Sequence, residues 1–190
     1  MTWNAFHHRG EILRTVVETA DARRDGVLPM QLPGVAETFR DELDLLAALW
    51  LKWNARLSGN IERTLMTQPM DLEDAVASAW RVTAEQVPGI RAILDRYTES
   101  PSDPEMAAAL GRASEKEWCR LAAAAGLAND ESPAAARAGR QIASKARAAA
   151  AEKAAAELLA SATTDVTPST NVGEHGTPSL VERIKAVLAA

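Results

Sequence analysis

The sequence has few of the residues that form cross-links or carry out redox chemistry. It contains one cysteine, Cys119, and three histidines in 190 residues. A single cysteine cannot form a disulfide within the chain, which fits a reducing compartment. No stretch approaches the roughly 18 consecutive apolar residues of a membrane-spanning helix, and the first residues lack the basic and apolar regions of a signal peptide. We therefore expect a cytoplasmic protein with no membrane span.

Motifs for catalysis and cofactor binding are also missing. The sequence has no glycine-rich phosphate loop, no H-E-x-x-H, no G-x-S-x-G and no paired-cysteine motif. His7 and Glu11 have a spacing that could begin a metal site, but Arg14 lies beside them and would pair with the carboxylate. Cys119 has no candidate base nearby in the sequence. We expect no catalytic residue, no metal and no cofactor, and the sequence favours a protein that is not an enzyme.

Basic residues are too few for a general nucleic-acid binder. The formal net charge is −5, whereas phosphate contacts require a basic surface. We therefore do not expect a nucleic-acid partner for the chain as a whole.

Helical periodicity dominates what is present. In residues 35–66 the large apolar residues recur every three or four positions, which predicts one long packed helix. These residues are Phe39, Leu43, Leu46, Trp50, Trp53, Leu57, Ile61 and Leu65. Asp71 and Asp103 are expected to cap the starts of later helices, and Gly126 to end one. The sequence predicts an all-α fold, with about five bundled helices in residues 1–128, one of them long and central.

Composition divides the chain into four segments. Residues 1–128 are the acidic helical bundle, and residues 129–161 form an Ala-rich basic helix. Residues 162–178 have almost nothing with which to build a core and predict a flexible linker. Residues 179–190 form a short C-terminal amphipathic helix.

The last segment, SLVERIKAVLAA, has the features of a docking helix. Pro178 marks its start, and Ser179 with Glu182 forms a capping box. Its apolar residues fall on one stripe: Leu180, Val181, Ile184, Val187 and Leu188. A helix this short is marginal alone in water, so it needs a surface to lie on. That surface is either the protein's own bundle or a groove on a partner.

Two segments resemble known kinds of tail. The helix SLVERIKAVLAA behind its linker resembles the terminal peptides that direct cargo enzymes into bacterial microcompartments. The stretch SKARAAAAEKAAAELL resembles the low-complexity tails of granule-coating phasins and of linker-histone-like proteins, although it lacks the repeated Lys-Pro content of the latter. The first resemblance implies docking onto a protein partner, and the second implies association with a granule or nucleoid.

Three hypotheses follow from the sequence. The leading one is a non-enzymatic adaptor recruited to a protein partner through the apolar stripe of residues 179–190. A second is a small-molecule-binding or enzymatic bundle whose pocket is lined by Trp50, Trp53 and Trp80. A third is a granule- or nucleoid-associated protein that uses the basic Ala-rich helix. The sequence leaves the oligomeric state open, including a homo-oligomer.

Overall fold

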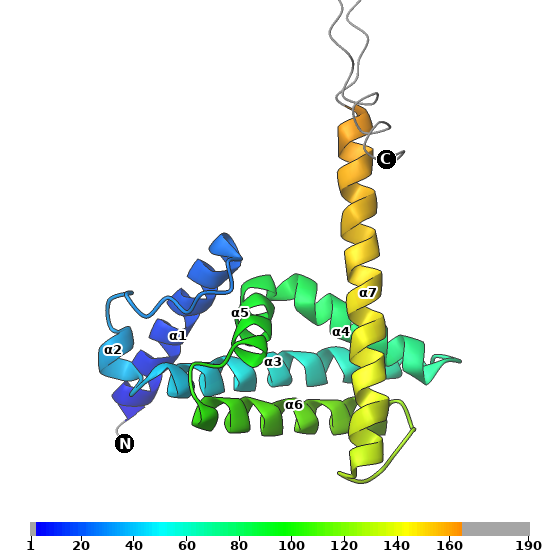
Figure 1. Cartoon of the computed structure of the whole chain (residues 1–190), viewed down its shortest axis with the longest axis horizontal. Helices are drawn as coiled ribbons and strands as arrows, with labels where there is room; N and C mark the ends of the chain where they lie inside the picture. Colours follow the sequence, from blue (N-terminus) through cyan, green and yellow to red (C-terminus); the bar gives the residue numbers. More distant parts are fainter. Residues whose placement is uncertain (1–2, 165–190) are drawn as a thin grey trace, which may run out of the picture. The chain divides into compact units, whose positions relative to one another are not determined.

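The computed structural model describes residues 3–164 and is built from helices, with no strand in this part of the chain (Figure 1). This confirms the all-α prediction for these residues. The helices are α1 (Trp3–Arg23), α2 (Val35–Thr38), α3 (Glu42–Leu65), α4 (Leu72–Gln86), α5 (Pro88–Glu99), α6 (Pro104–Ala124) and α7 (Pro133–Thr164). Residues 1–153 form one compact unit, called the helical unit below, and a second unit begins at Ala154.

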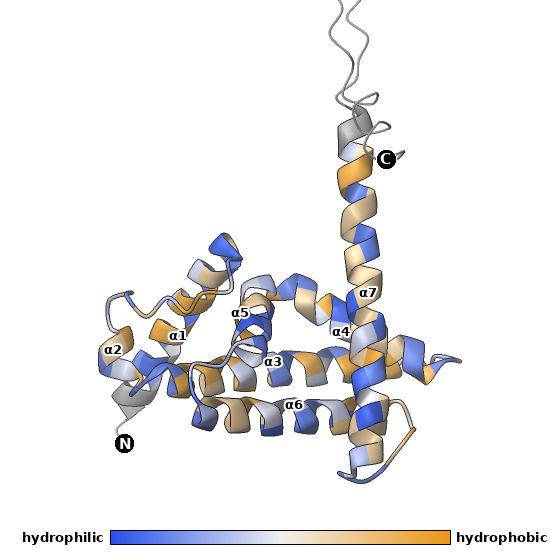
Figure 2. Cartoon of the chain, in the orientation of Figure 1, coloured by the Kyte–Doolittle hydropathy of each residue, from blue (hydrophilic) through white to orange (hydrophobic). Residues whose placement is uncertain are grey.

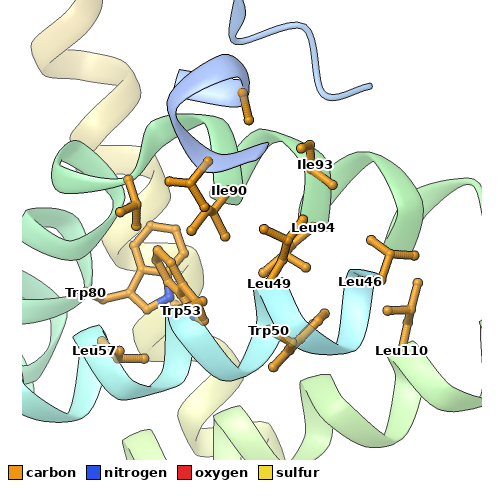
Figure 3. Close-up of a cluster of buried hydrophobic side chains, with 14 of the residues drawn as sticks. Leu46, Leu49, Trp50, Trp53, Leu57, Trp80, Ile90, Ile93, Leu94 and Leu110 are labelled. Atoms are coloured by element: carbon orange, nitrogen blue, oxygen red, sulfur yellow. The ribbon is translucent and has the colours of Figure 1, made fainter. Parts of the chain in front are cut away.

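Helix α3 supplies the centre of the core. The middle of the apolar stripe that the sequence predicts on it is buried, with Trp53 and Leu57 fully enclosed, whereas Leu43 and Leu65 near its ends are partly buried. The helices α4, α5 and α6 all contact α3, and α1 contacts α5 as well as α3. Figure 3 shows side chains from α3, α4, α5 and α6 meeting in this core. The core of the helical unit therefore forms around the helix with the strongest apolar periodicity.

The predicted long helix over residues 35–66 is interrupted. The structure has a short α2, then extended backbone at Phe39 and Asp41, then α3. The Asp41 side chain accepts a hydrogen bond from the backbone N–H of Asp44 at 2.7 Å, so it caps a new helix start. The sequence F-R-D-E-L-D thus acts as a helix boundary within an unbroken apolar period, which is why periodicity alone predicted one helix.

Other helix ends agree with the sequence signals. The side chains of Asp71 and Asp103 accept hydrogen bonds from backbone N–H groups three residues on, at 2.9 and 2.8 Å. Pro88 and Pro104 occupy the first positions of α5 and α6. Gly126 follows α6 with a φ of 70°, the left-handed conformation that glycine adopts without strain.

Two glycines mark points where helices cross closely. A Cβ atom added at Gly89 of α5 would lie 2.1 Å from the backbone of Ala20 in α1. A Cβ atom added at Gly139 of α7 would lie 1.7 Å from the backbone of Trp118 in α6. No side chain fits at either crossing, so these glycines allow two helix pairs to pack backbone against backbone.

Helix α7 has a buried face over its first half only. Ala135, Ile142, Ala143 and Ala146 are buried, whereas residues 151–161 are all exposed. Near the end of its described part, α7 carries a strongly hydrophobic turn, orange in Figure 2. Leu158 and Leu159 are each 72% exposed there. None of the helices in the described part is long and apolar enough to cross a membrane.

The boundaries of the C-terminal segments differ in one respect from the prediction. Helix α7 continues to Thr164, so it extends into the start of the predicted linker over residues 162–178. The alanines of this region favour helix, and the sequence has no breaker before residue 164. The rest of the linker and the predicted docking helix over residues 179–190 lie outside the described residues.

Candidate functional site

The structure brings together the three tryptophans that the sequence singled out. Trp53 and Trp80 are almost fully enclosed, and their rings meet edge to face with centroids 5.5 Å apart. Figure 3 shows these two rings together between α3 and α4, with Trp50 further along α3. Trp50 is 6% exposed. The three rings therefore belong to the core and share one region of it.

A buried carboxylate joins two of these rings. Glu117 of α6 is only 3% exposed. One of its oxygens accepts a hydrogen bond from Trp53 Nε1 at 2.9 Å, and the other accepts from Trp80 Nε1 at 3.1 Å. Because both oxygens receive a donor, the carboxylate is held in a fixed orientation between α3, α4 and α6.

An arginine on α5 completes the cluster. The Arg91 guanidinium lies over the rings of Trp53, Trp80 and Trp50, at 4.7, 5.7 and 6.0 Å from their centroids. It pairs with Asp95 at 2.8 Å and lies 3.8 Å from a Glu117 oxygen. Arg91 Nε and Nη1 and Trp50 Nε1 are buried without a hydrogen-bond partner. The cluster is consequently rich in buried donors.

Helix α7 reaches the same cluster from the outside. Arg147 lies over the Trp80 ring at 4.8 Å from its centroid and pairs with Asp95 at 3.1 Å. Asp95 is thus shared between Arg147 of α7 and Arg91 of the buried cluster. The cluster links side chains from α3, α4, α5, α6 and α7.

Sequence analysis did not find Glu117 or Arg91, although Glu117 left a signal. Leu110, Ser114, Glu117 and Leu121 follow one another at three- and four-residue intervals on α6, and all four are buried. A carboxylate on a buried helix face requires donors, and the indoles of Trp53 and Trp80 are the donors that the structure provides. The position of Glu117 on an apolar stripe of α6, beside Trp118, was therefore the sequence feature that could have indicated a buried carboxylate.

Three further basic residues of α7, namely Arg140, Lys145 and Lys153, contact side chains of α6 or α4. Arg140 lies over the Trp118 ring at 4.4 Å from its centroid. Lys145 pairs with Asp74 and Lys153 pairs with Glu85, both on α4. The Asp74 carboxylate raises the pKa of Lys145 above its ordinary value by hydrogen bonding to the ammonium group. Four basic residues of the Ala-rich helix therefore interact with side chains elsewhere in the chain.

The other sequence candidates do not form a site among the described residues. His7 and His8 are exposed, and no group of three or more potential metal ligands occurs in residues 7–161. Cys119 is buried, and this burial, followed by the nearby charges of Glu131 and Asp130, raises the pKa of its thiol. A raised pKa lowers the thiolate fraction and thus the reactivity of the thiol. The predicted partner-binding residues Leu180, Val181, Ile184, Val187 and Leu188 lie outside the described part.

The surface has a hollow between α1 and α3. It measures about 400 Å³ and is lined mainly by apolar groups, with an ion pair at one side. Its lining residues are Arg9, Gly10, Leu13, Asp44, Ala47, Ala48 and Leu51. A second hollow, of about 300 Å³, lies where α6 meets the loop before α7 and is lined by charged residues beside Cys119. Trp50, Trp53 and Trp80 line neither of these hollows.

Comparison with known proteins adds no assignment: no family model, curated protein or solved structure matches the chain.

Proposed function

We propose that the protein is a non-enzymatic helical adaptor that docks onto a protein partner through its C-terminal region. The docking element is the amphipathic segment 179–190, with the stripe Leu180, Val181, Ile184, Val187 and Leu188 as the contact surface. The helical unit would serve as the folded body that the segment recruits.

The observation that carries this proposal is the exposed hydrophobic turn on α7. Leu158 and Leu159 are each 72% exposed. At about 100° per residue, these positions fall on a different side of a regular helix from the buried residues Ala135, Ile142 and Ala146. Ala148, Ala151 and Ala155 fall on the same side of such a helix as the two leucines. The described end of α7, which precedes segment 179–190 in the chain, therefore carries exposed apolar side chains.

The composition of the core supports the same proposal. The main buried cluster extends from Val16 to Ala146. Large side chains fill its centre, among them Trp53, Trp80, Phe39 and Leu57. The apolar stripe of five residues that the sequence predicts in segment 179–190 is well suited to a surface on another protein, since helices with one apolar face bind hydrophobic grooves.

The test is a capture experiment with point variants of the full chain. The tagged protein is compared with Leu180→Asp plus Ile184→Asp, which places charges on the stripe, and with Glu182→Gln, which alters a residue off the stripe. A partner should be recovered with the parent chain and with Glu182→Gln but lost with the double variant. Equal recovery with all three proteins would rule out docking through the stripe.

A second candidate is small-molecule binding at the tryptophan cluster. It is favoured by the unpartnered buried donors of Trp50 and Arg91, since a ligand with acceptor oxygens could receive them. Binding there would change tryptophan fluorescence and would be unaffected by removal of residues 178–190. The granule or nucleoid hypothesis receives less support, because ion pairs and ring contacts within the chain already engage Arg140, Lys145, Arg147 and Lys153.

A further inference from the structure

We propose that α4, α5 and α6 together form a docking surface for basic helices of small residues, which α7 of the same chain covers and which α7 of a second copy can cover instead. The surface and its occupant both lie within residues 73–153. The proposal is therefore independent of the C-terminal segment on which the proposed function rests.

The surface combines acidic side chains with aromatic rings. Asp74 and Glu85 lie on α4, and Asp95 lies on α5. The rings of Trp80 in α4 and Trp118 in α6 lie beneath Arg147 and Arg140 of α7. Carboxylates recognise arginine and lysine side chains through ion pairs, and aromatic rings recognise them through cation–π contacts.

The basic side chains of α7 are complementary to the carboxylates and rings of this surface. Arg147 and Lys153 pair with Asp95 and Glu85 at 3.1 and 2.8 Å, and Lys145 pairs with Asp74. Arg140 and Arg147 lie over the two rings, 4.4 and 4.8 Å from their centroids. Every one of these groups belongs to a 21-residue stretch of α7, residues 133–153, so the stretch alone carries what the surface recognises.

The contacts between α7 and helices α4, α5 and α6 are weak enough for α7 to detach from these helices. Its buried face consists of alanines, Gly139 and one larger residue, Ile142. Small side chains bury little apolar area, and the hydrophobic contribution scales with that area. The paired side chains of Lys145 and Asp74 are 53% and 61% exposed, so salt screens their attraction. By contrast, α3 buries Trp53, Leu45, Leu46 and Leu49 completely.

A second copy is the occupant that the structure specifies. A second copy carries the same residues 133–153, so the ion pairs and ring contacts form equally well between two chains. Within one chain, α7 is connected to α6 only through residues 125–132, which are mostly exposed. If this loop opens, two copies exchange α7 and each recovers the contacts it gave up.

Complementary charge reversal tests the exchange. One variant carries Lys145→Glu and Lys153→Glu, so its α7 repels its own surface. The other carries Asp74→Lys and Glu85→Lys, so its surface repels its own α7. Mixed together, each α7 finds an oppositely charged surface on the other chain. In sedimentation velocity at low salt we expect a one-to-one species near twice the 20.3 kDa chain mass, which dissociates as salt is raised.

The matched control is Lys52→Glu plus Arg56→Glu, which makes the same change in charge at exposed positions of α3. Mixed with the lysine-substituted surface variant, this control should give no such species. Finding only the species that each charge-reversed variant forms alone would overturn the proposal.

A peptide covering residues 133–153 gives a second, independent measurement. A fluorescent peptide should bind the Lys145→Glu, Lys153→Glu chain at least about tenfold more tightly than the parent chain, whose surface its own α7 occupies. It should not bind the Asp74→Lys, Glu85→Lys chain. Equal affinity for all three chains would also overturn the proposal.

Discussion

Glu117 is a charged residue that can be buried in the core because each of its carboxylate oxygens accepts a hydrogen bond. Two indole N–H groups donate to it, and the Arg91 guanidinium lies 3.8 Å away. A buried carboxylate without such partners would be strongly unfavourable. The cluster also fixes how α3, α4 and α6 meet, since both indoles must reach the same carboxylate.

Replacing Glu117 with glutamine should destabilise the protein by about 1–3 kcal/mol, because the amide retains one acceptor oxygen but turns an N–H₂ group toward the other indole N–H. Urea unfolding followed by tryptophan fluorescence measures this change. Glu115→Gln, an exposed change on the same helix, is the control and should stay within about 0.5 kcal/mol of the parent. Equal effects from the two substitutions would show that the indole hydrogen bonds do not matter for stability.

Asp44 gives a prediction about pH. The hydrogen bond from Arg9, 2.9 Å from the Asp44 carboxylate, lowers the pKa of Asp44 below its ordinary value. A lowered pKa means that the ionised side chain stabilises the fold above the ordinary carboxyl pKa. This stability is lost as pH falls through the lowered value. Asp44→Asn should therefore be less stable than the parent near pH 6, and the difference should shrink in strong acid.

Unfolding midpoints measured across the acid range test this sign. Glu18→Gln removes an exposed carboxylate whose partner Arg14 is 3.9 Å away, and it should leave the pH profile nearly unchanged. A difference between Asp44→Asn and the parent that grows toward low pH would contradict the assignment.

At the scale of helices, most helix boundaries can be predicted from the sequence. Helix starts at Asp71 and Asp103 and the helix end at Gly126 follow from local hydrogen bonding and backbone conformation. The break at Phe39–Asp41 was missed, because apolar periodicity continues across it and only the Asp41 cap interrupts the helix. The Glu117–Arg91 cluster was missed because its side chains lie far apart in the sequence, on five helices. Contacts of this kind depend on how the helices are packed.

Alanine substitutions at two helical glycines should have opposite effects on stability, because only one of the two glycines lies at a helix crossing. Gly139→Ala should destabilise the protein by about 1–3 kcal/mol, because the new Cβ would overlap the Trp118 backbone and force α6 and α7 apart. Gly59→Ala, in α3, meets nothing within 4 Å and should stabilise it by about 0.5–1 kcal/mol through helix propensity. Thermal unfolding compares the two, and a stabilising Gly139→Ala would contradict the close crossing.

At the scale of the whole molecule, the buried core indicates which parts of the chain contribute to the stability of the fold. The main cluster extends from Val16 to Ala146, and residues 151–161 are exposed. If segment 179–190 docks onto a partner, the helical unit should fold without the C-terminal segment. The alternative is a segment 179–190 that folds back and adds its five aliphatic side chains to the same unit.

Truncation separates these two roles. A chain ending at Thr164 should unfold at the same urea concentration and with the same m-value as the full chain, because the slope follows the surface exposed on unfolding. A segment that packs back on the helical unit would instead add buried area, so truncation would lower both the midpoint and the m-value. Unfolding curves of the two chains, measured side by side, distinguish the outcomes.

The most direct test of docking through residues 179–190 is quantitative affinity capture from the native host, with the full chain and with a chain ending at Thr177 as baits. We predict a protein recovered with the full chain and absent with the shorter one. A synthetic peptide of residues 179–190 should release that protein from the full-length bait. Identical recovery with both baits, or no release by the peptide, would contradict docking through the C-terminal helix.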